Sequence, residues 1–324
     1  MRAAVVEAFG PFDAIQVKAI EAPSPQPGEI RIRVAVAGVN FADGGMVSGR
    51  TPRKQPPFVP GVEAAGVIDA VGQDVTDQRV GDRVVYWDPM PRAFAELVTV
   101  PAWRAVPIAA GVPDDVAVAL MVQGTTAHYL VTNSFNLGAG HTCLIHAAAG
   151  GVGQLLVQLA AMRGATSIAI VGGEDKAKLA RELGATVVID RLQHELAAAV
   201  REATGGQGAD VVYDGVGAAT IQTSLLSTRK RGTCVLYGAA SGAVTTLDTS
   251  LMQRSGSIFL HRPGLADYLR DAPEYRERMA DLFKWYAAGA LKPRFGGEWP
   301  LDGVGEALAR ITAGKTTGKL LIRI

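Results

Sequence analysis

The feature that most constrains this chain of 324 residues is an immediate succession of strand, glycine-rich turn and helix. The largely apolar run 143–146 predicts a buried strand, and the apolar spacing of 155–162 predicts a helix that begins directly after the turn. Backbone N–H groups without partners and the helix dipole favour an anion at such a helix N-terminus. The missing side chains of Gly150 and Gly153 allow close approach of a ligand and of the strand. We therefore expect a pyrophosphate site at this turn.

The turn departs from the usual dinucleotide fingerprint at one position. In the G-x-G-x-x-G frame the three key positions hold Ala148, Gly150 and Gly153, so that alanine replaces the first glycine. One alternative is a glycine-rich loop that only lets the helix pack closely on the sheet. The strand before the turn and the helix after it favour nucleotide binding.

The end of the next strand candidate predicts which dinucleotide binds. The run 167–171 ends about twenty residues past the glycines, where NAD-binding folds place an acidic residue on the ribose. This chain has Gly172 there, which leaves room for a 2′-phosphate that a carboxylate would repel. Lys176 and Arg191 are candidate phosphate ligands. The sequence favours NADPH over NADH, although Glu174 and Asp175 argue mildly against it.

Composition narrows the class of protein. The net charge of +1 gives no basic footprint for nucleic acid or acidic membranes. We expect no signal peptide and no membrane span, because no apolar run is long and clean enough. The two cysteines, Cys143 and Cys234, lie in apolar strand candidates and are expected to be core residues. A cytoplasmic enzyme fits these observations.

The order of periodicities predicts an α/β chain of two domains. The first third alternates as half-buried strands do, with candidates at 29–36, 62–71, 82–86 and 93–100. The segment 117–130 has helical spacing and is expected to break at Gly124. Strands then alternate with helices, which predicts a doubly wound parallel sheet from 143–146, 168–171, 187–189, 211–213, 234–237 and 258–260.

The alternation stops after Pro263. Two helices, 273–288 and 304–312, then precede a last strand at 318–324. We therefore expect a cofactor domain at 123–263, inserted into a catalytic domain built from 1–122 and 264–324.

Motifs along nearly the whole chain carry a family resemblance. They are Gly38–Asp43, Pro60–Gly66, Gly81–Val84, Gln123–Tyr129, His146–Gly153, Val212–Gly217, Tyr237–Gly242 and Gly318–Lys319. In this order they resemble the zinc-independent quinone oxidoreductase branch, also called ζ-crystallin-like, of the medium-chain dehydrogenase/reductase superfamily. The resemblance implies a GroES-like β-rich catalytic domain and a Rossmann cofactor domain, and it is far more specific for the branch than for the substrate.

The resemblance also implies site residues. Asn40, Asp43 and Gln123 match the family's positions around the nicotinamide and acceptor, and these three are our catalytic candidates. The implied cofactor-binding residues are Asn40, Gln123, Thr126, Ala148, Gly150, Gly151, Val152, Gly153, Gly172, Lys176, Arg191, Gly238, Ser241 and Lys319. Plainer roles stay open, since Asn40 and Asp43 are also typical turn residues and Gln123 also suits helix packing.

No metal is expected. Zinc-dependent relatives carry a cysteine and a Gly-His-Glu run where this chain has Asn40 and Val62, and neither side chain can replace a thiolate or an imidazole on zinc. We expect surface or strand-end positions for the five histidines, which lack zinc-site spacing: His128, His141, His146, His194 and His261.

The chain departs from the family pattern within the substrate segment. Relatives commonly carry Tyr and Arg where this chain has Gly45 and Val47. The absence of this Tyr and this Arg is expected to open the substrate cleft and to remove an aromatic platform and a positive charge from it. The acceptor can therefore differ from the family's usual quinone.

The resemblance implies an NADPH-dependent quinone oxidoreductase, because a quinone needs no Lewis acid to accept electrons. The alternatives are an NADPH-dependent enone or 2-alkenal reductase and a non-catalytic, crystallin-like protein that binds NADPH or RNA. The strand candidate 257–261 should lie at the sheet edge with unpaired backbone groups, so the resemblance to dimeric relatives implies a homodimer through it.

Overall fold

The computed structural model describes all 324 residues and divides them into two compact units. Unit 1 comprises 1–122, 269–288 and 293–324, and unit 2 comprises 123–268 and 289–292. The predicted boundary at 263/264 lies five residues before the observed one. The reason is that Tyr268 remains with unit 2, where its ring stacks on that of Tyr129 with centroids 4.1 Å apart.

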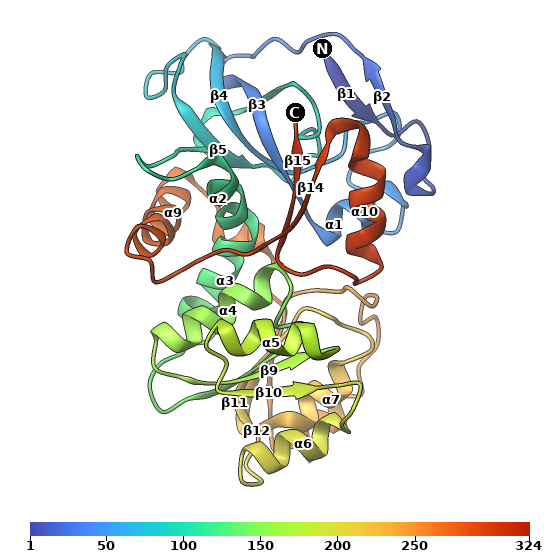
Figure 1. Ribbon diagram of the computed structural model, residues 1–324, viewed down its shortest axis with the longest axis vertical. Coiled ribbons are helices and arrows are strands. Elements are labelled where there is room, and N and C mark those ends of the chain that lie inside the picture. Colours follow the sequence, from blue (N-terminus) through green and yellow to red (C-terminus); the bar gives the residue numbers. More distant parts are fainter. The chain divides into compact units, whose positions relative to one another are not determined.

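Unit 1 is built on a seven-stranded sheet in the order β14-β15-β3-β4-β5-β7, with β6 paired to β3. A separate antiparallel pair joins β1 and β2 (Figure 1). The long strand β3 alternates as predicted, because Ile30, Ile32 and Val34 are buried in the core. The bounds are β1 Arg2–Val5, β2 Gln16–Ala19, β3 Glu29–Val39, β4 Glu63–Val71, β5 Arg83–Trp87, β6 Leu97–Pro101, β7 Ala105–Pro107, β14 Phe295–Pro300 and β15 Lys319–Arg323.

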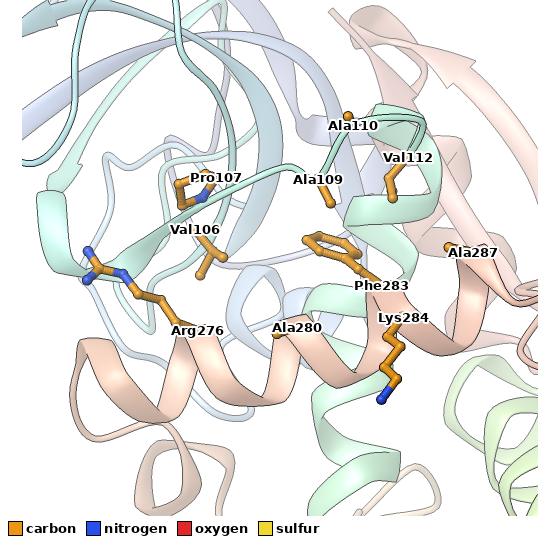
Figure 2. A pocket seen from close by; sticks show the side chains of 10 residues that line it. All are labelled: Val106, Pro107, Ala109, Ala110, Val112, Arg276, Ala280, Phe283, Lys284 and Ala287. Carbon is orange, nitrogen blue, oxygen red and sulfur yellow. The ribbon is translucent and has the colours of Figure 1, made fainter.

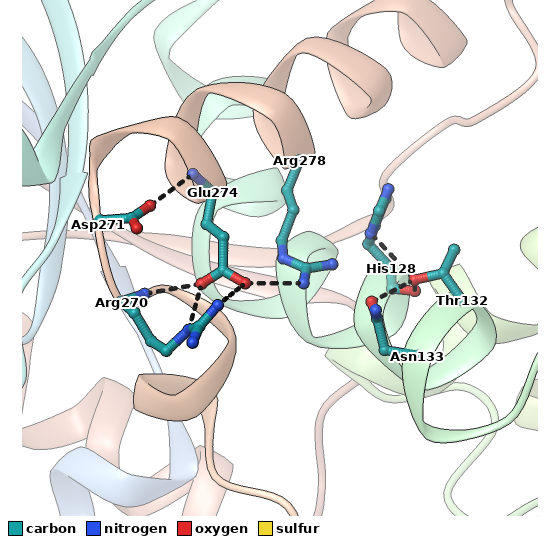
Figure 3. A network of polar contacts seen from close by, with 7 residues as sticks. All are labelled: His128, Thr132, Asn133, Arg270, Asp271, Glu274 and Arg278. Atoms are coloured by element: carbon teal, nitrogen blue, oxygen red, sulfur yellow. Dashed lines mark hydrogen bonds and ion pairs between the residues drawn. The ribbon is translucent and has the colours of Figure 1, made fainter.

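Four α-helices accompany this sheet: α1 Phe41–Val47, α2 Asp114–Ala119, α9 Ala272–Ala287 and α10 Val304–Thr312. The start of α9 is fixed by its own side chains, as Figure 3 shows. The Asp271 carboxylate accepts from the Glu274 N–H at 3.0 Å, and the Glu274 carboxylate accepts from the Arg270 N–H at 3.0 Å. This reciprocal capping satisfies backbone donors that a helix N-terminus otherwise leaves unpaired.

Unit 2 contains the predicted doubly wound sheet. Its six strands are parallel in the order β10-β9-β8-β11-β12-β13, and α4 and α5 cover one face while α6 and α7 cover the other (Figure 1). The strands are β8 Thr142–Ile145, β9 Thr166–Val171, β10 Val187–Asp190, β11 Ala209–Asp214, β12 Thr228–Leu236 and β13 Phe259–His261. The α-helices are α3 Thr125–Tyr129, α4 Gly151–Met162, α5 Glu174–Glu182, α6 Leu196–Ala203, α7 Ile221–Ser227 and α8 Thr249–Arg254.

The predicted helix break at Gly124 is wrong. Gly124 has helical backbone angles (φ −68°, ψ −49°), and helical structure continues on both sides of it. The two flanking segments Leu120–Gly124 and Leu130–Ser134 are π-helical. A wider turn absorbs an extra residue without ending the helix, and such turns are frequent near functional sites.

No helix combines the length and the apolar character that crossing a membrane requires. Both cysteines are buried and unpaired, as expected for core residues.

Candidate functional site

The glycine-rich turn lies between β8 and α4 of unit 2. Gly150 is the N-cap, and no side chain caps the first turn of α4. The first turn of α4 also carries no acidic residue of its own that would compete with a bound anion. Ala148 is fully buried, and its N–H donates to the Ile170 carbonyl at 3.1 Å, which ties the turn to the end of β9.

Close approach explains the last glycine of the turn. A Cβ on Gly153 would lie 2.8 Å from the Ala148 Cα, whereas a Cβ on Gly150 would meet nothing closer than the Ala147 carbonyl oxygen at 3.1 Å. Ala147 itself has a positive φ of 50°, which bends the chain sharply out of the strand. The shape of the turn is therefore set by the backbone, and a helix N-terminus of this kind favours an anion.

Gln123 and Gly151 meet at this turn. A Cβ on Gly151 would collide with the Gln123 carboxamide, so only glycine leaves that amide in place. Gln123 is buried, and its Oε1 has no hydrogen-bond partner. An unpaired buried oxygen costs free energy unless a ligand donor reaches it. Thr126 is also buried, one helical turn further on.

The adenosine end of the predicted site brings Gly172, Lys176 and Arg191 together. A Cβ on Gly172 would lie 3.3 Å from the Arg191 guanidinium, which therefore covers that glycine. Burial and the neighbouring Arg191 charge lower the pKa of Lys176. Three acids lie nearby in sequence: Glu174 pairs with Arg181 at 2.7 Å, Asp175 directly precedes Lys176, and Asp190 accepts from the Gly173 N–H at 3.1 Å. Two cations that converge beside a glycine form a good site for a phosphate.

The loop after β12 is held by the loop after β11. The Ser241 hydroxyl donates to the Val216 carbonyl at 2.9 Å and accepts from the Ala219 N–H at 2.9 Å. A Cβ on Gly238 would lie 2.7 Å from the Gly215 Cα. Ser241 and Gly238 thus position this loop through contacts inside the protein.

In unit 1, Asn40 and Lys319 belong to a buried polar cluster. The Asn40 Nδ2 donates to Glu63 Oε1 at 2.6 Å, and the Lys319 ammonium donates to Asn40 Oδ1 at 3.1 Å and to the Val39 carbonyl at 3.2 Å. Lys319 also forms an ion pair with Glu63, and both side chains are fully buried. All three ammonium donors are used, so Lys319 holds Asn40 in position.

Sequence reasoning missed the role of Glu63. Its second oxygen accepts from the Val122 N–H at 2.8 Å, so the carboxylate joins the strand β4 to the π-helical segment that follows α2. A Cβ on Gly38 would lie 2.5 Å from Glu63 Oε1 and 2.7 Å from Lys319 Nζ, which explains the glycine in that motif. The available signal was a single acid at the start of the otherwise apolar run 62–68.

Asp43 lies beside this cluster at the third position of α1. Its Oδ2 accepts from the Asn40 N–H at 2.7 Å, and its Oδ1 has no partner. Burial raises the pKa of Asp43 to about 7, against the lowering effects of the Asn40 N–H, Lys319 and Arg53. The carboxyl can therefore hold or release a proton near neutral pH.

The expectation that Gly45 and Val47 open the cleft is wrong. Val47 is 1% exposed and belongs to the core of unit 1. Gly45 is buried beneath Thr51, whose hydroxyl would collide with any Cβ at position 45. The Thr51 N–H donates to the Gly45 carbonyl at 3.0 Å, so the following loop folds back over the space.

Two of the five histidines are buried: His146 lies at a strand end, as one of the two expected positions, whereas His128 lies inside a helix and is neither at the surface nor at a strand end. His146 follows β8, is 2% exposed, and contacts the Ser224 hydroxyl at 2.9 Å. That hydroxyl lies 2.7 Å from an oxygen of Asp214. Burial lowers the pKa of His146. His128 is buried within α3, where its carbonyl accepts from Thr132 at 2.8 Å (Figure 3).

No group of three or more His, Cys, Asp or Glu side chains is arranged to hold a metal ion. At the position where zinc-dependent relatives place ligands, Glu63 is already neutralised by Lys319, and Val62 is apolar. This donor set does not fit zinc.

A separate hollow of about 400 Å³ lies on unit 1, between α9 and the segment 106–112. Figure 2 shows Phe283 on α9 facing Ala109 and Val112. None of the candidate site residues lines it.

Family profiles match both parts of the chain. Residues 26–114 match the profile described as "Alcohol dehydrogenase GroES-like domain". Residues 151–284 match the profile described as "Zinc-binding dehydrogenase".

Individual relatives match over almost their whole length. The chain is 36% identical to a quinone oxidoreductase of Pseudomonas aeruginosa, covering 97% of each. It is 37% identical to a 2-haloacrylate reductase of Burkholderia, covering 99% of this chain and 98% of the relative. The crystal structure of Escherichia coli quinone oxidoreductase complexed with NADPH matches with a TM-score of 0.97 at 31% identity, over 100% of both chains.

Proposed function

Because this chain belongs to the quinone oxidoreductase branch of the medium-chain dehydrogenase/reductase superfamily, we propose that it reduces a quinone or another activated carbonyl compound without a metal. It is an oxidoreductase, and its reductant is NADPH. The observation that carries the proposal is the bare N-terminus of α4, together with the convergence of Lys176 and Arg191 beside Gly172.

The chain's own residues have distinct tasks in this proposal. The N–H groups of Gly151, Val152 and Gly153 bind the pyrophosphate, and Lys176 and Arg191 bind the 2′-phosphate. Gln123, with its unpaired buried Oε1, is suited to accept from the nicotinamide carboxamide. When bound, NADPH supplies a hydride, and a quinone becomes a quinol after taking up that hydride and one proton.

Unit 1 supplies the acceptor side. Asn40, held by Glu63 and Lys319, orients the acceptor oxygen, and Asp43 is placed to hold or release the proton. Lys319 and Glu63 are positioning residues in this scheme. The Lys319 ammonium forms an ion pair with the Glu63 carboxylate, so that this carboxylate is not available as a zinc ligand. This pairing supports a reaction without a metal.

The direct test is to measure NADPH oxidation with a panel of ortho- and para-quinones. The reaction is monitored through the absorbance of the reduced nicotinamide. We expect turnover with several quinones and no loss of rate after dialysis against a chelator. No turnover across the panel would contradict quinone reduction, and one tightly bound zinc per chain would contradict the metal-free reaction.

A second candidate function is reduction of the C=C bond of an enone or 2-alkenal. The similarity to a 2-haloacrylate reductase favours it, since that relative is named for an activated alkene. The same NADPH site would serve, and only the acceptor would differ. Product analysis with an enal distinguishes a saturated aldehyde from an allylic alcohol.

We also infer a homodimer through the edge of the unit 2 sheet. The strand β13 pairs only with β12, and Phe259 on it is 64% exposed. An unpaired edge with an exposed aromatic residue invites a second chain. Sedimentation should give a dimer at micromolar concentration, and Phe259→Lys should shift it to the monomer. A monomeric unmodified protein would contradict the inference.

A cytoplasmic location and the lack of nucleic-acid binding remain proposals. The near-neutral net charge of +1 and the two unpaired core cysteines support them.

A further inference from the structure

The loop after α1 carries an unusual set of cations. Arg50, Arg53 and Lys54 are all exposed, and none of them forms an ion pair. Arg50 lies over the Phe41 ring at 5.9 Å, and Arg53 donates to the Pro89 carbonyl at 3.1 Å. No acidic residue occurs from position 44 to position 62. The positive charge of this loop is therefore not compensated by its own segment.

Most other arginines of unit 1 are neutralised by a nearby carboxylate. The pairs are Arg2 with Asp302, Arg31 and Arg33 with Asp69, Arg83 with Asp114, Arg92 with Asp88, Arg276 with Asp77, Arg310 with Glu306 and Arg323 with Asp115. Three neighbouring cations without such partners leave a local positive potential, which raises the local concentration of anions.

The loop lies beside the acceptor residues of unit 1. The Arg53 charge is near enough to Asp43 to oppose the effect of burial on that carboxyl. Arg50 packs on Phe41, the residue next to Asn40. Thr51 lies between these cations in the sequence and covers Gly45. Its hydroxyl occupies the space that a side chain at position 45 would need. A polar, positive loop thus borders the residues proposed to orient the acceptor.

We propose that Arg50, Arg53 and Lys54 make the protein select acceptors that carry a carboxylate or sulfonate next to the reducible quinone or alkene. The inference rests on the proposed reductase function and names its substrate class. Exposed cations attract an anion through solvent, so that they act mainly on kcat/KM and lose their effect at high salt.

The test uses a matched pair of acceptors, 1,4-naphthoquinone and its 2-sulfonate, at saturating NADPH. The variant Arg50→Gln/Arg53→Gln/Lys54→Gln is compared with the unmodified protein. We expect its kcat/KM for the sulfonate to fall about tenfold, because the attraction of three exposed cations is lost, while the value for the neutral quinone changes by less than about twofold. Raising the salt concentration should remove the difference between the two proteins.

The control is Arg79→Gln/Arg201→Gln/Lys230→Gln, which makes the same change in net charge at exposed positions outside this loop. It should leave both kcat/KM values within about twofold, since screened charges outside the loop contribute little. An equal fall for both acceptors in the loop variant, or an equal effect of the control variant, would overturn the inference.

NADPH carries the other anionic groups in this assay, its 2′-phosphate and its pyrophosphate. One contrary outcome is a rise in the KM for NADPH in the loop variant while the ratio of the kcat/KM values for the two acceptors stays the same. This result would show that the cations act on the cofactor and would refute selection of the acceptor. Absence of turnover with either acceptor in the unmodified protein would instead refute the proposed function.

Discussion

The two halves of the molecule carry candidate regions that are built in opposite ways. The turn between β8 and α4 is a backbone structure, in which the useful groups are N–H donors and the important side chains are missing ones. The cluster of Asn40, Glu63 and Lys319 is a side-chain structure, made of charged and polar groups buried together. A backbone site comes from one contiguous stretch, whereas the side-chain cluster joins positions up to 279 residues apart.

This difference predicts how each half responds to substitution. A buried ion pair is costly to break, since the partner left behind remains charged in a medium that solvates it poorly. A backbone anion site is insensitive to most side-chain changes but sensitive to any atom added where the chain packs closely. Four substitutions test this contrast.

The largest effect is expected for Lys319→Met. It leaves the Glu63 carboxylate buried without its cation, and the free energy of unfolding should fall by about 3–5 kcal/mol in chemical denaturation. The matched control is Arg310→Met, whose pair with Glu306 is exposed and should cost less than about 1 kcal/mol. The double variant Lys319→Met/Glu63→Gln should recover part of the loss. Equal losses of unfolding free energy for Lys319→Met and Arg310→Met would contradict the larger contribution expected of the buried pair.

Lys176→Ala tests the phosphate end of the backbone site. Loss of a charge-assisted hydrogen bond should raise the KM for NADPH by about tenfold to a hundredfold and leave the KM for NADH unchanged. Lys178→Ala, on the same helix and exposed, is the control and should change neither value. An unaltered KM for NADPH in Lys176→Ala would show that this lysine does not bind the phosphate.

Gly153→Ala should weaken the turn more than Gly150→Ala does. The added Cβ at position 153 would meet the Ala148 Cα at 2.8 Å, whereas at position 150 its nearest neighbour is an oxygen at 3.1 Å. Overpacking should cost about 1–3 kcal/mol of stability and reduce NADPH affinity in titrations. If both alanine variants bound NADPH equally well, close approach at Gly153 would not explain the motif.

The smallest effect concerns Asp43 and pH. Burial raises its pKa from 3.8 to about 7, so the folded protein keeps a proton that the unfolded chain has lost over that range. Its contribution therefore lowers the free energy of unfolding as the pH rises from about 4 to 7. Asp43→Asn cannot ionise, and its stability relative to the unmodified protein should increase across this window. Parallel stability curves for the two proteins would contradict the raised pKa.

Much of the fold followed from the sequence, because periodicity is a local property. The six parallel strands and the helices between them appear where alternation predicted them, and β13 lies at the sheet edge as expected. Gly124 misled the prediction, since glycine is permissive but does not force a break when neighbouring turns can widen. The substrate segment also misled it, because Thr51 fills the space that Gly45 was expected to open.

The sequence by itself determined the cofactor side of this protein. A strand, a turn and a helix are contiguous, so that their order and their glycines specify the proposed pyrophosphate site directly. Only the tertiary structure decided the acceptor side. Burial raises the pKa of Asp43 and brings Glu63 and Lys319 together as an ion pair, whereas no carboxylate from elsewhere in the chain pairs with the exposed cations of residues 50–54. These properties depend on which distant groups share a low-dielectric interior or a surface, and no local pattern encodes that.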